Sequence, residues 1–181
     1  MSQSILNKTP ETLFLNSVKK IAIVYSSWHQ SIVENAVKAS KDYFEKNGIT
    51  SDKIAIYMLP GAFELPLHVK KLAQMGEFDA IIACGFVVNS GIYKHEYVAS
   101  AVIDGLMTAQ LESGVPVFSA VLTPHYFHEH EDHIDFFSKN FTKKGTEVAE
   151  TCIQTLVSLY SLERNTDKLT SSPNNYRALP S

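Results

Sequence analysis

The sequence predicts an α/β protein built as a three-layer α/β/α sandwich around a four-stranded parallel sheet. Short β-branched runs recur along the chain, and we expect strands at 20–26, 53–59, 80–88 and 115–122. Stretches with apolar residues at helical spacing follow them, and we expect helices at 32–44, 64–75, 93–113 and 148–160. Regular alternation of strands and helices favours parallel pairing through right-handed crossovers, with helices on both faces of the sheet.

Local signals mark the ends of the first two strand–helix units. The first strand is a continuous apolar run, as expected for a buried strand, and Asn47-Gly48 ends the helix that follows it. The second strand alternates between apolar and polar residues and ends at the turn Pro60-Gly61. The next helix begins at Glu64 and ends at Gly76.

The second half of the chain repeats this pattern. The run 80–88 is the most apolar of the four, so we expect it at the centre of the sheet. The long helix after it ends at Gly114, and Pro116 fits only near the start of the fourth strand. From about Thr166 the sequence becomes polar. We therefore expect an N-terminal extension at 1–19, one domain at 20–161 and a disordered tail at 162–181.

Composition and charge argue against several classes of protein. The 181 residues are enough for one domain with a substantial core, and 45% of them are hydrophobic. A net charge of −3 without a basic stripe argues against a nucleic-acid partner. No segment approaches the roughly 20 apolar residues of a membrane span, so we expect no membrane partner. Cys84 and Cys152 both lie in apolar segments, which favours a reduced protein in the cytoplasm.

Two loops follow predicted strands and are candidates for a binding site. They are Leu59–Pro66 and Gly85–Gly91. The carboxyl ends of parallel strands form the ligand crevice of an open α/β sheet. There, glycines let backbone N–H groups approach a polar substrate closely, and the carboxylate of Glu64 can hold hydroxyl groups.

Five motifs then point to a family. They are Pro60–Leu67, the strand and loop that end at Gly91, His95–Ala99, Leu111–Val117 and Lys144–Ala149. In these motifs, and over about 20–160 as a whole, the chain resembles the lumazine synthases of the riboflavin pathway.

The resemblance implies a flavodoxin-like fold and a defined reaction. 5-Amino-6-(D-ribitylamino)uracil condenses with 3,4-dihydroxy-2-butanone 4-phosphate to give 6,7-dimethyl-8-ribityllumazine, phosphate and water. It also implies that no redox cofactor is needed, and we expect no metal. The family assembles as pentamers whose active sites are shared between neighbouring subunits, and some members form decamers or icosahedral shells. We therefore expect a homo-oligomer, either a pentamer or a dimer of pentamers.

The resemblance assigns substrate-binding roles to four residues of the first half. Trp28 occupies the position of an aromatic residue that stacks on the pyrimidine, although it could instead anchor the core or an interface. Ala62, Phe63 and Glu64 match positions that hold the ribityl chain. The alternatives are simple packing for Phe63 and capping of the following helix for Glu64.

Four more positions are carried over from the family. The backbone at Val87 and Val88 matches the strand end that reads the uracil edge, whereas their side chains are core residues. Gly91 matches a loop that offers N–H groups to phosphate at a helix N-terminus. Lys144 matches a lysine at the pyrimidine end of the site, although many lysines are simply solvated.

The chain departs from the family pattern at several positions. Ile92 replaces a phosphate-binding threonine, and Phe136 aligns with the phosphate-binding arginine. The catalytic histidine aligns with Lys94, and His95 lies one residue further on, so both are candidates for the proton shuttle. Ser119 stands where the family has a phenylalanine near the end of the fourth strand.

These departures have a pattern of their own. Trp28, Gly91–His95 and Thr123–Glu129 resemble a divergent bacterial branch of the family that is associated with decamers. A phosphate dianion needs positive charge or N–H donors. We therefore expect His125, His128 or both to bind near the phosphate.

Three other readings compete with this one. The histidine-rich stretch His125–His133 suggests a metal site, but it lacks zinc-protease spacing, and a pH-titrating surface cluster is the simpler account. A dinucleotide oxidoreductase is disfavoured because the turn Ser26–His29 contains no glycine. A weakly catalytic shell that binds flavin or lumazine stays open as the alternative function.

Overall fold

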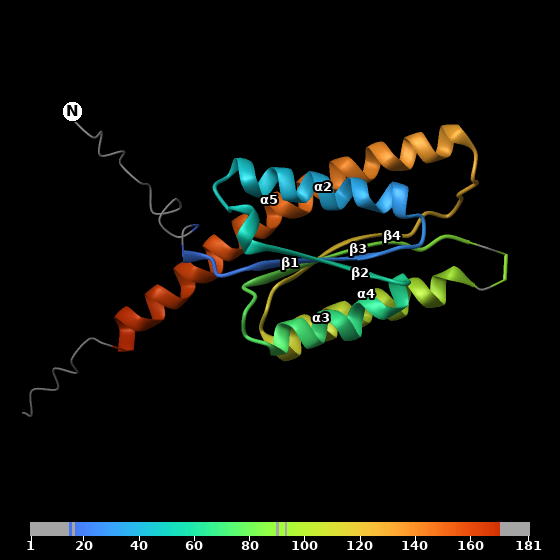
Figure 1. The fold of residues 1–181 in the computed structure, drawn as a ribbon. Coiled ribbons are helices and arrows are strands. Elements are labelled where there is room, and N and C mark those ends of the chain that lie inside the picture. Colours follow the sequence, from blue (N-terminus) through green and yellow to red (C-terminus); the bar gives the residue numbers. More distant parts are fainter. Residues whose placement is uncertain (1–14, 16, 90, 93, 171–181) are drawn as a thin grey trace, which may run out of the picture.

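The computed structural model describes residues 15, 17–89, 91, 92 and 94–170, with side chains to residue 164. Four parallel strands form one sheet in the order β2-β1-β3-β4. They are β1 (Ile21–Ser26), β2 (Ile54–Leu59), β3 (Ala80–Phe86) and β4 (Val117–Leu122). Figure 1 shows helices α2 (Gln30–Lys46) and α5 (Glu131–Thr170) on one face and α3 (Leu65–Gln74) and α4 (His95–Ser113) on the other. The predicted three-layer fold is confirmed.

The strand register brings the functional loops to one edge of the sheet. Ser26 pairs with Leu59, Tyr25 with Cys84, and Phe86 with Leu122. The carboxyl ends of the strands therefore lie together, and we call this side of the molecule the carboxyl edge and the opposite side the amino edge. Short 3-10 turns precede and follow β2, at Ser51–Lys53 and Ala62–Glu64.

The core lies in two layers, one on each face of the sheet. Every residue of β1 and β3 is buried, because these strands are central and helices cover both of their faces. On the α2/α5 face the core includes Phe44, Phe86 and Phe141, and on the α3/α4 face it includes Leu65 and Leu106. The expectation that the run 80–88 is central is confirmed.

Close contact between α2 and α5 depends on a glycine. A Cβ atom at Gly145 would lie 2.3 Å from the Ala36 carbonyl oxygen, so no side chain fits there. The Ser40 hydroxyl donates a hydrogen bond to the Gly145 carbonyl at 2.9 Å, and both residues are buried. These contacts fix the path of α5, which runs from the carboxyl edge to the amino edge (Figure 1).

The ends of the chain differ from the expectation in two respects. Helix α5 is much longer than predicted and reaches Thr170, so 162–170 is helical and the expected disordered tail is wrong for this segment. Residues 171–181 lie outside the described part of the chain. In the expected N-terminal extension, Val18 is only 2% exposed and packs in the core, whereas residues 1–14 and 16 also lie outside the description.

Smaller differences occur inside the domain. Helix α4 begins at His95 and β4 at Val117, two residues later than expected in each case. Gly114 ends α4 with a left-handed backbone, φ 72°, as the sequence predicts. Among the described residues, no helix is both long and apolar enough to cross a membrane.

Candidate active site

The turns after β1 and β2 are joined by two hydrogen bonds. The backbone N–H of Ser27 donates to the Leu59 carbonyl at 2.7 Å, and the Ser27 hydroxyl donates to the Pro60 carbonyl at 3.0 Å. The loop Leu59–Pro66, which the sequence singles out, is therefore held at its start to the turn that carries Trp28.

The side chains of Trp28 and Glu64 both approach the same glycine, Gly61. A Cβ atom at Gly61 would lie 2.9 Å from Glu64 Oε2 and 3.8 and 3.9 Å from two carbon atoms of the Trp28 indole. The carboxylate and the indole thus meet at one point of the carboxyl edge. The Trp28 side chain is 69% exposed, so it is not a core anchor within the chain.

Within the chain, Phe63 does not serve simple packing and Glu64 does not cap the following helix with its side chain. Phe63 is 64% exposed and does not serve simple packing here. Glu64 occupies the N-cap position of α3, but its side chain makes no capping hydrogen bond. Ala62 is buried, and its Cβ lies 3.3 Å from the position of a Cβ on Gly85, so β3 passes closely beneath this turn. The exposed aromatic ring and the exposed carboxylate are both available to a ligand.

The residues after β3, Val87 and Val88, place their backbone at the carboxyl edge and their side chains in the core. The N–H of Val87 donates to the Leu122 carbonyl at 2.9 Å, and the Val87 side chain is buried in the α3/α4 layer. Val88 is half-buried against the α2/α5 layer. Their side chains are core residues, as the sequence predicts.

A hollow of about 550 Å³ opens between the end of β3 and the start of α4. Its lining comprises Asn89, Gly91, Ile92, Lys94, His95, Glu96 and Tyr97. The Gly91 N–H is not free for a phosphate here, because it donates to Asn89 Oδ1 at 2.9 Å, and α4 begins only at His95. Ile92 is 82% exposed and presents an apolar side chain to the hollow.

The two candidates for the proton shuttle differ in environment. His95 is buried, and its Nδ1 lies 3.4 Å from Glu96 Oε2 without forming a hydrogen bond. Lys94 is exposed, and its Nζ lies 5.8 Å from the centre of the Tyr97 ring. Among the described residues, the His95 Nδ1 has no hydrogen-bond partner, and His95 lines the hollow, which makes it a candidate for proton exchange with a ligand.

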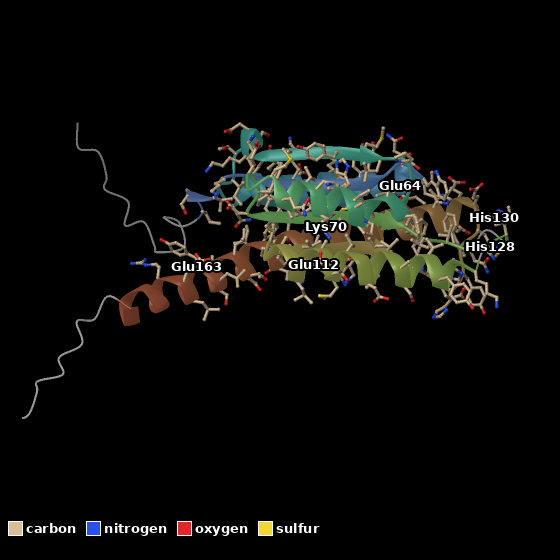
Figure 2. All side chains as sticks on the ribbon, turned by 90° about the horizontal axis from the view of Figure 1, so that it is seen from below. Glu64, Lys70, Glu112, His128, His130 and Glu163 are labelled. Atoms are coloured by element: carbon tan, nitrogen blue, oxygen red, sulfur yellow. The ribbon has the colours of Figure 1, made fainter. Side chains whose placement is uncertain are left out.

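The histidine-rich stretch between β4 and α5 is anchored by an aromatic residue. Phe127 is 9% exposed and packs edge-on against Phe86, the last residue of β3, with ring centres 5.0 Å apart. His125 and His128 flank it and are exposed, and the His128 N–H donates to His133 Nδ1 at 3.2 Å. Figure 2 shows His128 and His130 at the same end of the molecule as Glu64.

This stretch does not form a metal centre with the residues that the structure describes. No group of three or more His, Cys, Asp or Glu side chains among them converges in a way that could hold an ion. The His128 and His133 rings are tilted by 32° with their centres 5.6 Å apart, and the His133 Nδ1 already accepts a hydrogen bond.

Within one chain, Ser119 and Lys144 lie away from the other candidates. Ser119 is exposed in the middle of edge strand β4, where it pairs with Ala83, and its Oγ accepts the Val121 N–H at 3.2 Å. Lys144 lies about 20 Å along α5 from the start of the helix. Its Nζ forms an ion pair with Glu147 Oε2 at 2.5 Å, and the pKa of Glu147 is lowered by this hydrogen bond.

One residue of the edge was not singled out by the sequence. His29 follows Trp28 and packs edge-on against both Phe86 and Phe127, with ring centres 5.5 and 5.0 Å apart. Its place directly after the first strand, in a turn without glycine, was the available signal.

Comparison with known proteins identifies the family of the chain. The family model for 6,7-dimethyl-8-ribityllumazine synthase matches residues 18–159. The 6,7-dimethyl-8-ribityllumazine synthase of Rhodococcus erythropolis is 49% identical over 144 residues, which cover 80% of this chain and 93% of the relative. The 6,7-dimethyl-8-ribityllumazine synthase 2 of Bradyrhizobium diazoefficiens is 47% identical (80% and 86%), and that of Pseudomonas syringae pv. tomato is 44% identical (81% and 86%). The chain therefore belongs to the 6,7-dimethyl-8-ribityllumazine synthase family.

Proposed function

We propose that the carboxyl edge is the active site at which this chain performs the reaction of its family. The enzyme acts in riboflavin biosynthesis and condenses 5-amino-6-(D-ribitylamino)uracil with 3,4-dihydroxy-2-butanone 4-phosphate to 6,7-dimethyl-8-ribityllumazine, releasing phosphate and water. The observation that carries the assignment is the approach of the Trp28 indole and the Glu64 carboxylate to one glycine, Gly61.

The first substrate has two parts, and each finds a matching group. Its flat pyrimidine stacks on the exposed indole of Trp28, which contributes on the order of 1 kcal/mol beyond area burial. Its ribityl hydroxyl groups donate hydrogen bonds to the Glu64 carboxylate, which no capping bond occupies. Phe63 lies beside the ribityl chain of the substrate. The backbone around Val87 and Val88 faces the edge of the uracil ring.

Catalysis needs positioning and proton transfer more than a strong nucleophile, because the substrate amine is itself the nucleophile. Holding the two substrates together lowers the barrier by several kcal/mol. We assign the proton shuttle to His95, which lines the hollow before α4 and whose buried Nδ1 has no hydrogen-bond partner among the described residues. Lys94 supplies positive charge to the same hollow. His95→Gln should then lower kcat by about 100-fold, whereas Lys94→Met should mainly raise KM for the phosphorylated substrate.

The phosphate is assigned to the part of the edge that carries His125 and His128. Helices α2, α3 and α4 all begin at this edge, and helix N-termini favour anions. Phe136 is 58% exposed on α5 and cannot replace an arginine, so we assign to the histidine side chains the role of N–H donors to the phosphate. The double variant His125→Ala/His128→Ala should raise KM for 3,4-dihydroxy-2-butanone 4-phosphate and leave KM for the pyrimidine nearly unchanged. An unchanged KM for the phosphate substrate would remove these residues from the site.

The active form is a homo-oligomer, either a pentamer or a dimer of pentamers. Helix α4 carries an exposed apolar stripe, Ile103, Met107 and Leu111, which are 40, 51 and 74% exposed and lie four residues apart. Lys144 and Ser119 lie away from the crevice of their own chain and are assigned to the site of a neighbouring subunit. Met107→Glu should then yield smaller particles in analytical ultracentrifugation.

The deciding experiment measures turnover and mass on one preparation. Product formation is followed by the fluorescence of 6,7-dimethyl-8-ribityllumazine, and mass by light scattering. Rapid turnover that Trp28→Ala and Glu64→Ala each reduce supports the assignment. Tight flavin binding without turnover would instead favour the shell protein, which the synthase names of the compared relatives do not support. A reducing cytoplasmic location fits the free, buried thiols of Cys84 and Cys152.

A further inference from the structure

His29 has an unusual backbone next to the exposed tryptophan. Its φ and ψ are 53° and 41°, and among the described residues it is the only non-glycine residue with a positive φ. L-amino acids rarely adopt this left-handed conformation, because Cβ approaches the following carbonyl oxygen. Glycine would be the default residue here, so a histidine at this position indicates that its side chain contributes something that glycine lacks.

The imidazole of His29 completes a cluster of three rings. It packs edge-on against Phe86 and Phe127, with interplanar angles of 80° and 75°. Phe86 and Phe127 pack edge-on against each other as well, at 80°. Phe86 is the last residue of β3, and Phe127 anchors the stretch that carries His125 and His128. The ring of His29 therefore ties the turn after β1 to two other parts of the carboxyl edge.

Trp28 lies between two anchored neighbours. On one side Ser27 is hydrogen-bonded to the Leu59 and Pro60 carbonyls. On the other side the His29 carbonyl accepts the first N–H groups of α2, from Ile32 at 2.9 Å and Val33 at 3.1 Å. Trp28 itself is 69% exposed and has little burial of its own to hold it. The backbone from which the Trp28 side chain projects is thus held on both sides.

We propose that His29 is a positioning residue for the family reaction. Its ring, held by Phe86 and Phe127, stabilises the left-handed turn that keeps the Trp28 indole beside Gly61 and Glu64. The expected effect of His29 on substrate binding rests on the proposed function. The expected effect of His29 on the Trp28 side chain does not, because it can be measured in the protein without substrate.

The test compares three variants of the full-length protein. His29→Gly keeps the left-handed turn favourable and removes the ring, so the protein should stay folded. His29→Phe keeps an aromatic ring for the cluster. His68→Ala is the matched control, because His68 also packs against an aromatic ring, that of Tyr57 at 5.5 Å, but from α3.

Trp28 is the single tryptophan of the chain, so tryptophan fluorescence reports on this side chain alone. In His29→Gly without substrate, the fluorescence anisotropy of Trp28 should fall and quenching by acrylamide should rise. KM for 5-amino-6-(D-ribitylamino)uracil should rise about 3- to 10-fold while kcat stays within 2-fold. His29→Phe should restore both readouts, and His68→Ala should change neither.

Two results would overturn the inference. One is a folded His29→Gly variant whose anisotropy and KM match those of the unaltered protein. The other is a His29→Phe variant as impaired as His29→Gly, since packing of the ring would then not be the cause. If instead Trp28→Ala has no effect on turnover, the assignment of the active site fails, while the anisotropy still decides the role of His29.

Discussion

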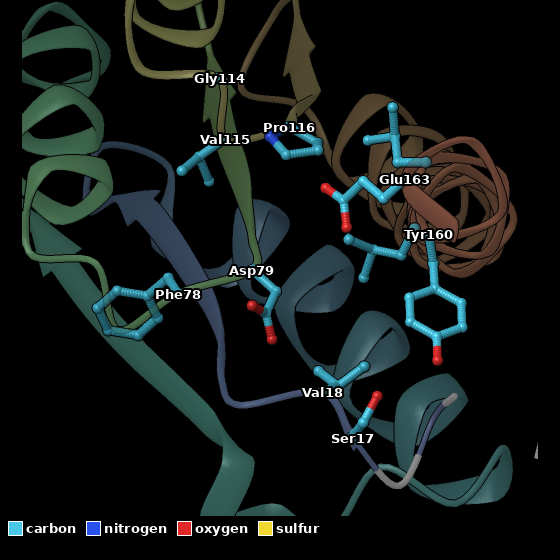
Figure 3. Close-up of a pocket in the computed structure, with 11 residues that line it drawn as sticks. Ser17, Val18, Phe78, Asp79, Gly114, Val115, Pro116, Tyr160 and Glu163 are labelled. Carbon is cyan, nitrogen blue, oxygen red and sulfur yellow. The ribbon is translucent and has the colours of Figure 1, made fainter. Parts of the chain in front are cut away.

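The two edges of the sheet each carry a hollow, and the hollows differ in chemistry. The one at the amino edge measures about 330 Å³ and is lined by Val18, Phe78, Asp79, Pro116, Glu163 and neighbouring residues (Figure 3). The one at the carboxyl edge measures about 550 Å³, and its lining includes Lys94 and His95. The comparison teaches that the direction of the strands, more than the presence of a hollow, is the reason for proposing an anionic substrate at the carboxyl edge.

The electrostatic reason lies in the direction of the helices. Helices α2, α3 and α4 begin at the carboxyl edge and end at the amino edge, so their positive ends face the first and their negative ends the second. At the amino edge the carboxylates of Asp79 and Glu163 face the hollow (Figure 3). Asp79 is already used in structure, since its Oδ2 accepts the Lys19 N–H at 2.5 Å. A phosphorylated substrate is therefore favoured at the carboxyl edge and repelled at the amino edge.

The largest expected effect comes from a side chain placed between Trp28 and Glu64. Gly61→Val would push the carboxylate aside, because a Cβ there lies 2.9 Å from Glu64 Oε2, and would crowd the indole. Loss of a charged hydrogen bond and of stacking should lower kcat/KM by about 100-fold. The change in kcat/KM is measured by steady-state kinetics, with product formation followed by lumazine fluorescence.

The control for this variant is a glycine of the amino edge. Gly114→Ala adds a methyl group where nothing lies within 4 Å, but φ is 72°. It should cost about 1 kcal/mol of unfolding free energy and leave kcat/KM unchanged. Equal kinetic losses in both variants would break the distinction between the edges.

The next effect compares one chemical change at opposite ends of the molecule. Figure 2 shows Glu64 and Glu163 far apart along the sheet. Glu64→Gln removes a charge from the proposed ribityl site and should raise KM for the pyrimidine substrate about 10-fold. Glu163→Gln removes a charge from the amino edge and should leave KM within the error of the assay. A larger change in Glu163→Gln would show that the amino-edge hollow takes part in binding.

The two cysteines in the buried core, between the carboxyl and amino edges, should be chemically unreactive in the folded protein. Burial raises the pKa of the Cys84 thiol to about 12 and also raises the pKa of Cys152. At neutral pH neither thiol should react with a thiol reagent until the protein unfolds. Rapid labelling of the native protein would show that one edge opens into the core.

The same shift predicts a dependence of stability on pH. Below the usual thiol pKa near 9 the folded and unfolded chains both keep the proton, so the thiol adds no pH dependence. Above it the unfolded chain loses the proton and the folded chain keeps it, so the free energy of unfolding should fall as pH rises towards 12. The pKa of Tyr25 is also raised, by burial and by the hydrogen bond to Glu34, and acts in the same direction. Urea titrations of the unaltered protein and of Cys84→Ala at pH 8 and 10 measure the part of this pH dependence of the unfolding free energy that comes from the Cys84 thiol.

The sequence predicted the fold better than the site because the two depend on different signals. Strands β1 and β3 are apolar runs whose burial on both faces needs no knowledge of distant residues. The Trp28–Glu64 pair depends instead on the register between β1 and β2, which brings Ser26 opposite Leu59. The family resemblance named both residues, but their approach to Gly61 is visible only in the folded chain. The position of His29 directly after the first strand was visible in the sequence, but its left-handed backbone and the ring contacts of Phe127 depend on the folded chain and could not be predicted.

The smallest expected effect concerns an ion pair that joins α3 to α4. Lys70 Nζ lies 2.6 Å from Glu112 Oε2, and Figure 2 shows the pair between the two edges. The side chains are 42 and 54% exposed, so water and salt screen their attraction. A double-mutant cycle with Lys70→Met and Glu112→Gln should give a coupling of at most about 0.5 kcal/mol in unfolding free energy. Turnover should not change, because neither side chain reaches the carboxyl edge; a loss of activity in either variant would mean that the helices transmit the state of this face to the site.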